Sequence, residues 1–340
     1  MQEIVLITGA TGFIGFKTLL LALEAGHTVR AVIRKPEQAQ KLKTHVKIVP
    51  HTDRLEFAVV PDLTKDGALD HVLVDVMAIL HIASPLDRAA DDYERNIISP
   101  AVGMITSLLN SAIKVPTIKR LIITSSMTTL IPFEWFAKPE GRIYTAKDRN
   151  LNPRRSVSLP MEAYWTSKAL ARNAVHDFVE TRKPHFETIQ MLPGVVMGSD
   201  DRASSTADLR NHTNQWALRL SPILGEKRTD SMVGVPVDLT DVARAQVEAI
   251  NPSIPGNVDY TLCAESPEGI VWDSMNEVAK KYFPDRVGSE EMPLGGTLPT
   301  MTWRVDARET EQVFGWKFST FEEMMKGVFE QYLELVDAER

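Results

Sequence analysis

Residues 4–15 read Ile-Val-Leu-Ile-Thr-Gly-Ala-Thr-Gly-Phe-Ile-Gly, and this stretch decides the fold of the chain. Four apolar residues rich in β-branched side chains are typical of a strand that is buried on both faces in a parallel sheet. Three glycines follow at three-residue spacing, and the segment from Phe16 to Ala25 predicts a helix that Gly26 ends. The sequence therefore predicts a strand, a tight turn and a helix.

A glycine turn of this kind lets bare backbone approach a pyrophosphate, whose charge then lies at the donor-rich start of the helix. The spacing Gly-x-x-Gly-x-x-Gly is a variant of the dinucleotide fingerprint. An ordinary strand-to-helix turn also needs glycine, but the position between a buried strand and an apolar helix favours nucleotide binding. The residues of the turn that we expect to contact the cofactor are Gly9, Thr11, Gly12, Phe13, Ile14 and Gly15.

The composition of the 340 residues, 44% hydrophobic and 24% charged, is that of a soluble globular protein with room for a large and a smaller domain. A net charge of −7 argues against nucleic-acid binding, and no apolar run approaches the ~20 residues that span a bilayer. The first strand begins by Ile4, which leaves no place for a signal peptide, and the single Cys263 permits neither an internal disulfide nor a zinc-thiolate cluster. We expect a cytoplasmic protein without a metal.

The second predicted strand, residues 27–34, ends where a dinucleotide site distinguishes NAD from NADP. An NAD site usually places an acidic residue there, whereas this chain has Arg34, Lys35 and, a little further on, Lys41. A solvated basic loop would look similar, but the cations favour the 2′-phosphate of NADP(H).

Further strands are predicted at 55–60, 76–82, 120–126 and 186–192, with helices at 96–112 and 162–179 between them. This alternation predicts an α/β fold with a Rossmann-type, doubly wound parallel sheet, whose ligands bind beyond the carboxyl ends of the strands. Asp62 lies at such an end, where it either caps the next helix or faces an adenine. We expect residues 1–195 to form the dinucleotide-binding domain, with a strand and a helix returning near 235–265. Residues 196–340, which end in an apolar-striped helix at 320–336, should form mainly a smaller α/β substrate-binding region.

Tyr164 and Lys168 are four residues apart on a predicted helix and therefore share one face. A buried cation near a tyrosine lowers the pKa of the phenol, so that it can exchange a proton near neutral pH. Carbonyl reduction needs such a proton for the developing alkoxide, and it needs a neutral hydroxyl to hold the carbonyl oxygen. Ser125 or Ser126, at the end of a predicted strand, could supply that hydroxyl.

Four motifs together resemble the extended short-chain dehydrogenase/reductases, the NAD-dependent epimerase/dehydratase superfamily: Thr8 to Gly15, Thr124 to Ser126, Tyr164 to Lys168, and Leu192 to Gly194. Within it, the chain is most similar to dihydroflavonol reductases, cinnamoyl-CoA reductases and fungal NADPH-dependent aldehyde and ketone reductases. The resemblance runs nearly from end to end. It implies that Tyr164 is the general acid, that Lys168 holds the nicotinamide ribose, and that Ser126 binds the substrate oxygen.

The same resemblance implies that Arg34 and Lys41 bind the 2′-phosphate and that Asp62 and Leu63 bind the adenine. The other cofactor contacts expected along the sheet edge are Ala83, Ser84, Thr124, Tyr164, Lys168, Pro193, Gly194 and Val195. Met127-Thr128-Thr129 departs from the small residues that often follow the serines. The substrate end is therefore the least defined part of the site.

Aromatic residues follow the hydroxyl-rich strand at Phe133, Trp135 and Phe136, where they either line a substrate pocket or pack the loop down. The expected pocket residues are Ser84, Met127, Phe133, Trp165 and Trp216. They indicate a small, fairly apolar carbonyl substrate, for example an aromatic compound or a secondary metabolite.

The leading hypothesis is thus an NADPH-dependent reductase of an aldehyde or ketone, acting as a monomer or homodimer. A sugar-nucleotide epimerase or dehydratase of the same superfamily is the first alternative, although those enzymes mostly prefer NAD. A non-catalytic NADP-sensing regulator is the second, although such proteins tend to lose the tyrosine and lysine pair that is present here.

Overall fold

The computed structural model describes residues 3–85, 90–138, 141–210 and 222–340. The chain divides into two compact units, each assembled from separate stretches. The first unit contains Met1–Phe136, Ala146–Leu192 and Ala243–Tyr260. The second unit contains Ala137–Thr145, Pro193–Val242 and Thr261–Arg340.

The first unit is built on a seven-stranded parallel sheet in the order β11-β7-β5-β4-β1-β2-β3. The strand order reverses between β1 and β4, so the chain leaves β1 toward one edge and later returns to the other side of it. The predicted Rossmann-type, doubly wound sheet is confirmed. Its strands are β1 (Ile4–Thr8), β2 (Thr28–Ile33), β3 (Leu55–Val59), β4 (Val76–His81), β5 (Arg120–Thr124), β7 (Glu187–Pro193) and β11 (Val258–Leu262).

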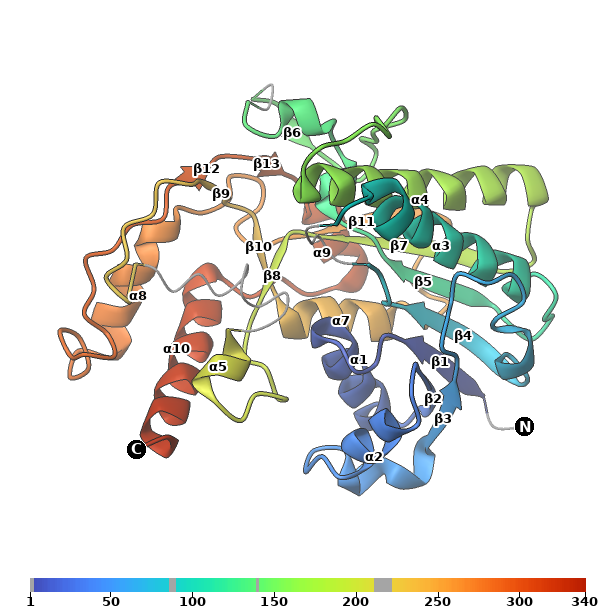
Figure 1. The fold of residues 1–340 in the computed structure, drawn as a ribbon, viewed down its shortest axis with the longest axis horizontal. Coiled ribbons are helices and arrows are strands. Elements are labelled where there is room, and N and C mark those ends of the chain that lie inside the picture. Colours follow the sequence, from blue (N-terminus) through green and yellow to red (C-terminus); the bar gives the residue numbers. More distant parts are fainter. Residues whose placement is uncertain (1–2, 86–89, 139–140, 211–221) are drawn as a thin grey trace. The chain divides into compact units, whose positions relative to one another are not determined.

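Helices cover both faces of this sheet, which is why all five residues of β1 are buried. Helices α3 (Ser99–Ala112) and α4 (Pro160–Arg182) lie side by side on one face, and α1 (Phe13–Glu24) lies on the other (Figure 1). Leu6 of β1, Leu108 of α3 and Val175 of α4 belong to one buried apolar cluster. The unit also contains α2 (Glu37–Lys43) and part of α7 (Leu239–Glu248). The division between the two units falls within α7, between Val242 and Ala243.

Helix α3 begins later than the predicted start at residue 96, because a single wide turn, the π-helix Glu94–Ile98, precedes it. Pro100 lies in the first turn of α3 and has no N–H to donate to the carbonyl four residues earlier. The regular hydrogen-bond ladder therefore starts only after this wider turn. Short 3₁₀ turns connect the other elements at Val49–Arg54, Asp70–Val72, Met127–Thr129, Phe133–Trp135 and Trp272–Ser274.

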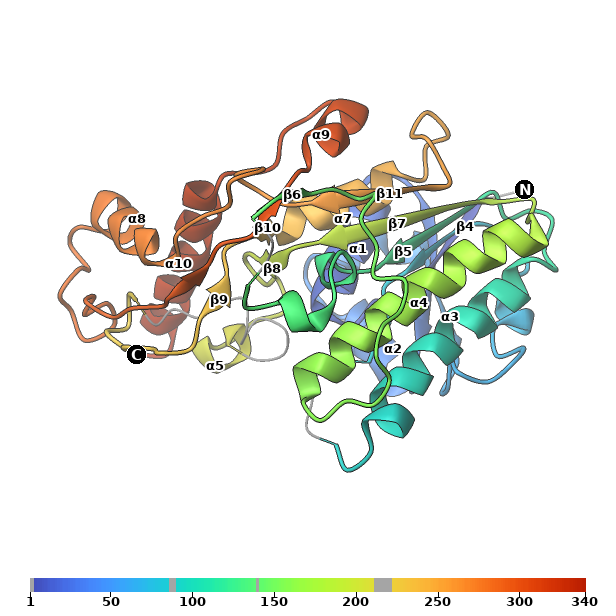
Figure 2. The same ribbon diagram turned by 90° about the horizontal axis from the view of Figure 1, so that it is seen from above.

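The second unit joins short strand pairs to helices around its own apolar core. Helices α8 (Met275–Tyr282) and α10 (Phe321–Ala338) pack against each other (Figure 2). Thr320 and Glu323 form a capping box that starts α10, which runs two residues past the predicted end. The remaining elements are β6 (Ile143–Tyr144), β8 (Val195–Met197), β9 (Met232–Val233), β10 (Pro236–Asp238), β12 (Thr300–Met301), β13 (Arg304–Val305), α5 (Thr206–Leu209) and α9 (Arg308–Phe314).

Among the residues that the structure describes, no helix is long and apolar enough to cross a membrane. The same residues contain no group of three or more histidine, cysteine or acidic side chains placed to hold a metal ion. Cys263 is buried, and burial raises the pKa of its thiol to about 12. The thiol is therefore protonated at neutral pH and is a poor nucleophile.

Candidate active site

The glycine turn between β1 and α1 is packed too closely for any side chain at two of its three positions. Gly9 has a φ of +77°, and a Cβ there would lie 2.8 Å from the Ala83 nitrogen. A Cβ on Gly15 would lie 2.0 Å from the Gly9 carbonyl oxygen. The third glycine therefore lets helix and turn touch, as the spacing predicts.

Helix α1 starts at this turn with properties that suit an anionic group. Gly12 is the N-cap residue and offers no side chain to the backbone N–H groups of the first turn. No acidic residue lies in that turn, and the turn places Thr11, Phe13 and Ile14 at the positive end of the helix. The site thus fits the pyrophosphate of a dinucleotide.

The end of β2 carries the expected cations in exposed positions. Arg34 follows the strand directly, and Lys41 lies on α2. The Gln38 Oε1 atom accepts hydrogen bonds from the backbone nitrogens of Arg34 at 2.8 Å and Lys35 at 3.1 Å. This side chain fixes the loop that presents the cations, and its amide lies 3.5 Å from the Thr11 hydroxyl at the glycine turn.

At the end of β3, Asp62 folds back on its own turn. Its Oδ1 atom accepts from the Thr64 hydroxyl at 2.6 Å and from the Thr64 nitrogen at 2.9 Å. The hydrogen bond from the Thr64 side chain is the largest cause that lowers the pKa of Asp62. The carboxylate caps this turn, while Leu63 is buried in the core of the first unit.

The ends of β1 and β4 are joined through one hydroxyl. The Thr8 Oγ1 atom lies 2.9 Å from His81 Nδ1 and accepts from the Ala83 nitrogen at 3.3 Å. Burial lowers the pKa of His81 to about 3, so its ring is neutral, and Nδ1 shares one hydrogen bond with the Thr8 hydroxyl. Ala83 and Ser84 are thereby held at the carboxyl edge of the sheet, where the Ser84 hydroxyl bonds the Pro85 carbonyl.

Helix α4 presents the tyrosine and lysine on one face, as predicted. Lys168 is buried, and its Nζ atom donates to the Thr124 carbonyl at 3.2 Å. The same Nζ atom lies 5.9 Å from the centre of the Tyr164 ring. Burial lowers the pKa of Lys168 to about 8, so the ammonium form is still well populated at neutral pH.

Ser126 follows β5, and its hydroxyl oxygen already accepts one hydrogen bond. Its Oγ atom accepts from the Thr128 nitrogen at 3.2 Å, which caps the 3₁₀ turn Met127–Thr129. A hydroxyl that accepts from a backbone N–H still has its own proton to donate. Ser126 therefore keeps a proton that it can donate, as the expected bond to a carbonyl oxygen needs.

A small cavity of about 20 Å³ lies between α3, α4 and the sheet edge. It brings together the predicted residues Ala83, Ser84, Thr124 and Lys168, and Ser125 lines it in place of Ser126. The Thr124 Oγ1 and Gln190 Oε1 atoms in its wall are buried without a hydrogen-bond partner. It is lined by His81, Ala83, Ser84, Pro85, Ala101, Met104, Ile105, Ile123, Thr124, Ser125, Lys168, Ala171, Arg172 and Gln190.

Three polar residues of this wall, His81, Arg172 and Gln190, were not predicted from the sequence. Arg172 had a usable signal, since it lies four residues after Lys168 and hence on the same helix face. His81 and Gln190 lie inside strands whose apolar neighbours conceal them.

The aromatic residues beyond β5 pack against one another. Trp165 is 2% exposed, its Nε1 atom donates to the Ile131 carbonyl at 2.8 Å, and its ring lies edge-on to Phe133 and Phe136. These contacts support the packing alternative for Phe133 and Phe136, because the two rings fasten the loop to Trp165 of α4. Met127 is buried in the adjacent turn, and Trp216 lies outside the described residues.

Three expected cofactor residues belong to the second unit, where the chain passes from β7 to β8. Gly194 follows Pro193, and its nitrogen donates to the Leu262 carbonyl at 2.9 Å. A Cβ on Gly194 would lie 2.1 Å from the Val235 carbonyl oxygen, so only glycine fits. Val195 then begins β8 and pairs with β10.

Comparisons with known proteins agree with these motifs. The chain matches the NAD dependent epimerase/dehydratase family over residues 5–218. It is 34% identical to the ketoreductase CTB6 of Cercospora nicotianae, over 98% of this chain and 96% of that protein. It is also 29% identical to the putative NADPH-dependent methylglyoxal reductase GRP2 of Candida albicans, over 93% and 94% of the two chains.

Among solved structures, the chain is similar to the yeast methylglyoxal/isovaleraldehyde reductase Gre2 complexed with NADPH. The TM-score is 0.84 at 24% identity, and the alignment covers 98% of this chain and 99% of the other. This likeness shows the fold. With the family match over more than half of its length and a relative of 34% identity, the chain belongs to the NAD dependent epimerase/dehydratase family, in which the extended short-chain dehydrogenase/reductase motifs place it.

Proposed function

We propose that this protein is an NADPH-dependent reductase of an aldehyde or ketone group on a small, fairly apolar molecule. The observation that carries the proposal is the position of Lys168, whose buried ammonium lies on one helix face with Tyr164 and bonds the end of β5. Its relatives of known name include fungal ketoreductases and an NADPH-dependent reductase.

The residues of the first unit fit the cofactor from one end to the other. The uncapped start of α1 suits the pyrophosphate, and Arg34 and Lys41 supply positive charge where NADP(H) carries its 2′-phosphate. Asp62, Leu63, Ala83, Ser84 and Thr124 follow along the same sheet edge. When bound, NADPH supplies the hydride that reduces the carbonyl carbon.

In this proposal each catalytic side chain has one task. Ser126 donates its hydroxyl proton to the carbonyl oxygen and so holds the substrate in place. Tyr164 gives its phenolic proton to that oxygen as negative charge develops on it. The ammonium of Lys168 lowers the pKa of the phenol and binds the ribose, which keeps the proton donor beside the reacting carbon.

The two alternatives are less well supported. A cofactor-retaining epimerase or dehydratase would use NAD, yet no acidic residue follows β2 at the position where NAD enzymes place one. A regulator that only senses NADP has no need of the tyrosine, lysine and serine that this chain retains. We also expect a cytoplasmic monomer or homodimer that does not bind nucleic acid, in keeping with its net charge of −7.

Replacing Tyr164 with phenylalanine tests the proposal. NADPH oxidation should be measured with methylglyoxal, isovaleraldehyde and aromatic and aliphatic ketones, alongside NADPH binding by fluorescence. We expect wild-type turnover with at least one carbonyl and a loss of about 10²- to 10⁴-fold in Tyr164→Phe, because the general acid is removed while the binding site remains.

The exposed tyrosine of α8 offers a matched control, since Tyr282→Phe removes the same hydroxyl elsewhere. Its turnover should equal that of the wild type. Near-normal turnover in Tyr164→Phe, or no NADPH oxidation by the wild type with any carbonyl, would refute the proposed reaction.

A further inference from the structure

Helix α4 carries four polar side chains at four-residue intervals, of which the proposed mechanism uses only the first two. After Tyr164 and Lys168 come Arg172 and His176. Arg172 is 1% exposed, although a buried guanidinium is costly unless it is paired and fully hydrogen-bonded. Its hydrogen-bond partners therefore indicate why this helix carries a buried arginine.

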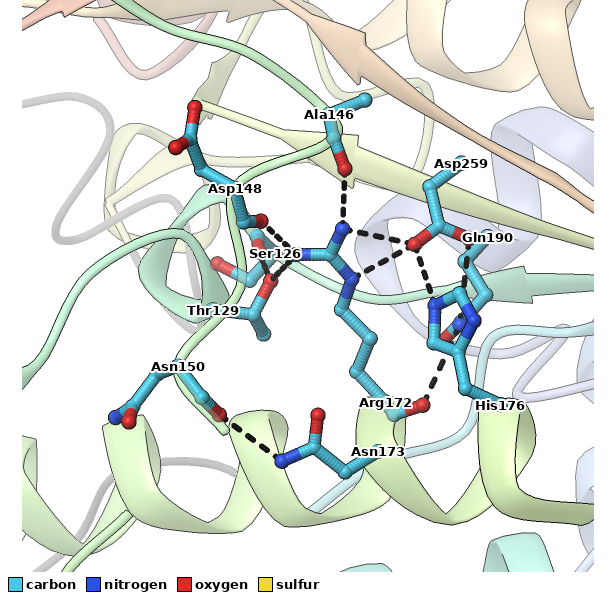
Figure 3. A network of polar contacts seen from close by, with 10 residues as sticks. All are labelled: Ser126, Thr129, Ala146, Asp148, Asn150, Arg172, Asn173, His176, Gln190 and Asp259. Atoms are coloured by element: carbon cyan, nitrogen blue, oxygen red, sulfur yellow. Dashed lines mark hydrogen bonds and ion pairs between the residues drawn. The ribbon is translucent and has the colours of Figure 1, made fainter. Parts of the chain in front are cut away.

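Every N–H group of the Arg172 guanidinium has a partner in the first unit (Figure 3). Nε donates to Asp259 Oδ2 at 2.8 Å, and one NH2 hydrogen returns to the same atom. The other donors reach the Ala146 carbonyl at 2.5 Å, the Asp148 carbonyl at 2.9 Å and the Thr129 hydroxyl at 2.9 Å. With five donors occupied, Arg172 has none left for a cofactor or substrate.

Asp259 of β11 neutralises this cation inside the protein. Its Oδ2 atom also accepts from His176 Nε2 at 2.8 Å, and its Oδ1 atom lies 3.4 Å from the Gln190 amide. Burial would raise the pKa of Asp259, but the hydrogen bond from His176 and the charge of Arg172 outweigh it and lower that pKa. The carboxylate is thus ionised and paired, and its contacts with Nε and NH2 fix the position of the guanidinium.

The contact with Thr129 connects this rigid group to Ser126. The Thr129 hydroxyl donates to the Ser126 carbonyl at 2.8 Å, and the Thr129 nitrogen donates to the same carbonyl at 3.1 Å. Because its proton is committed to Ser126, the Thr129 oxygen is an acceptor for Arg172. Thr129 is fully buried, so water does not compete for this chain of bonds.

A second clamp on the same turn comes from the neighbouring residue of α4. The Asn173 Nδ2 atom donates to the Asn150 carbonyl at 2.9 Å, and the Asn150 nitrogen donates to the Thr129 carbonyl at 2.9 Å. Thr129 is thus bonded through its side chain to Arg172 (Figure 3) and through its backbone to Asn150.

We propose that Arg172, acting through the Thr129 hydroxyl, is a positioning residue that fixes Ser126 relative to Tyr164 and Lys168 on the same helix. The inference rests on the proposed function, in which Ser126 holds the carbonyl oxygen. A donor displaced by a fraction of an ångström binds the developing alkoxide less well, so turnover depends on Arg172 and Thr129 although both act only through Ser126.

Removing Arg172 itself would leave the buried Asp259 without its guanidinium partner, with only His176 and Gln190 near it, which could prevent folding. Thr129 gives a sharper test, because two substitutions separate its hydroxyl from its volume. Thr129→Val keeps the shape and removes the hydroxyl, whereas Thr129→Ser keeps the hydroxyl and removes a buried methyl group. The readouts are kcat and KM with the carbonyl that the wild type reduces fastest, the Kd for NADPH, and the thermal midpoint.

We expect Thr129→Val to lower kcat about tenfold while leaving the Kd for NADPH unchanged, and Thr129→Ser to retain near-normal kcat despite its lost packing. Equal kcat in the two variants, or activity that simply follows the thermal midpoint, would overturn the inference. If Tyr164→Phe is inactive while Thr129→Val is fully active, the proposed function stands and the positioning role fails. If Tyr164→Phe is active, the proposed function fails first.

Discussion

The two ends of the proposed cofactor site are built in different ways. At the glycine turn the site consists of backbone, since Gly9, Gly12 and Gly15 contribute only N–H groups, carbonyls and the absence of side chains. At α4 it consists of side chains, and a buried ion pair lies on the same helix, one turn after Lys168. Gly9 and Gly15 of the backbone end leave no room for an added Cβ, whereas the side-chain end depends on contacts between distant parts of the sequence.

The largest effect is expected when a single methyl group is added to the glycine turn. In Gly15→Ala the new Cβ would lie 2.0 Å from the Gly9 carbonyl oxygen, so helix and turn must separate. We expect the Kd for NADPH to rise by about 100-fold or more, with a loss of stability from overpacking. Isothermal titration calorimetry and thermal unfolding measure both effects.

Gly103→Ala in α3 is the matched control for this substitution. Its Cβ would meet nothing closer than Thr64 Cβ at 3.5 Å, an ordinary contact, so affinity should not change and the helix should gain stability. If both variants bind NADPH equally well, close packing at the turn is not what the site requires.

A smaller effect is expected at Gln38, whose side chain lies next to the glycine turn. Gln38→Glu keeps the acceptor for the Arg34 and Lys35 nitrogens but adds a negative charge beside the expected 2′-phosphate. We expect the KM for NADPH to rise about tenfold and the KM for NADH to stay the same. Steady-state kinetics with both cofactors decide this.

The exposed Gln40 on the same helix provides the control with an identical change of charge. Gln40→Glu should leave the KM for NADPH within about twofold of the wild type, because solvent screens an exposed charge. A parallel rise in both cofactors' KM values for Gln38→Glu would mean that the loop itself had moved.

The smallest expected effect concerns the side-chain end and depends on pH. Burial lowers the pKa of Lys168 to about 8 from its ordinary 10.5, so between these values the unfolded chain binds a proton that the folded chain releases. Stability contributed by this group therefore rises with pH across that window. The free energy of unfolding should increase by about 1 kcal/mol from pH 8 to pH 9.5, relative to Lys168→Met.

Turnover should change in the opposite direction over the same window. In the proposed mechanism a neutral lysine no longer assists proton transfer from Tyr164, so kcat should fall as pH rises past about 8. Urea unfolding and pH profiles of kcat measure the two trends. An identical dependence of stability on pH in the wild type and in Lys168→Met would show that another group causes it.

Most of the first unit could be predicted from the sequence because its signals are local. Buried parallel strands are continuous apolar runs, and β1 to β5 begin and end within two residues of the predicted bounds. The two-residue strands β6, β9, β12 and β13 were not predicted, because two residues carry no periodicity. Their pairing depends on partners far along the chain.

The same distinction separates the predicted site residues from those that were missed. The glycine spacing and the four-residue interval from Tyr164 to Lys168 are visible within one element. The bonds from Arg172 to Thr129 and to Asp259 join residues 43 and 87 positions apart, and no local pattern marks them. The prediction that Ser126 holds the substrate oxygen stays a prediction, to which the structure adds the hydrogen bonds that hold its turn.

The hydrogen bonds from Arg172 to Thr129 and from Asn173 to Asn150 also attach the chain to helix α4 at two separate points. The carbonyls of Ala146 and Asp148 also accept hydrogen bonds from Arg172, so α4 holds the chain just before Leu130 and again from Ala146 onward. The turn that carries Ser126 is therefore fixed independently of the exposed side chains that follow it, such as Trp135 at 37% exposure. Substitutions at such a position should leave the Ser126 turn in place.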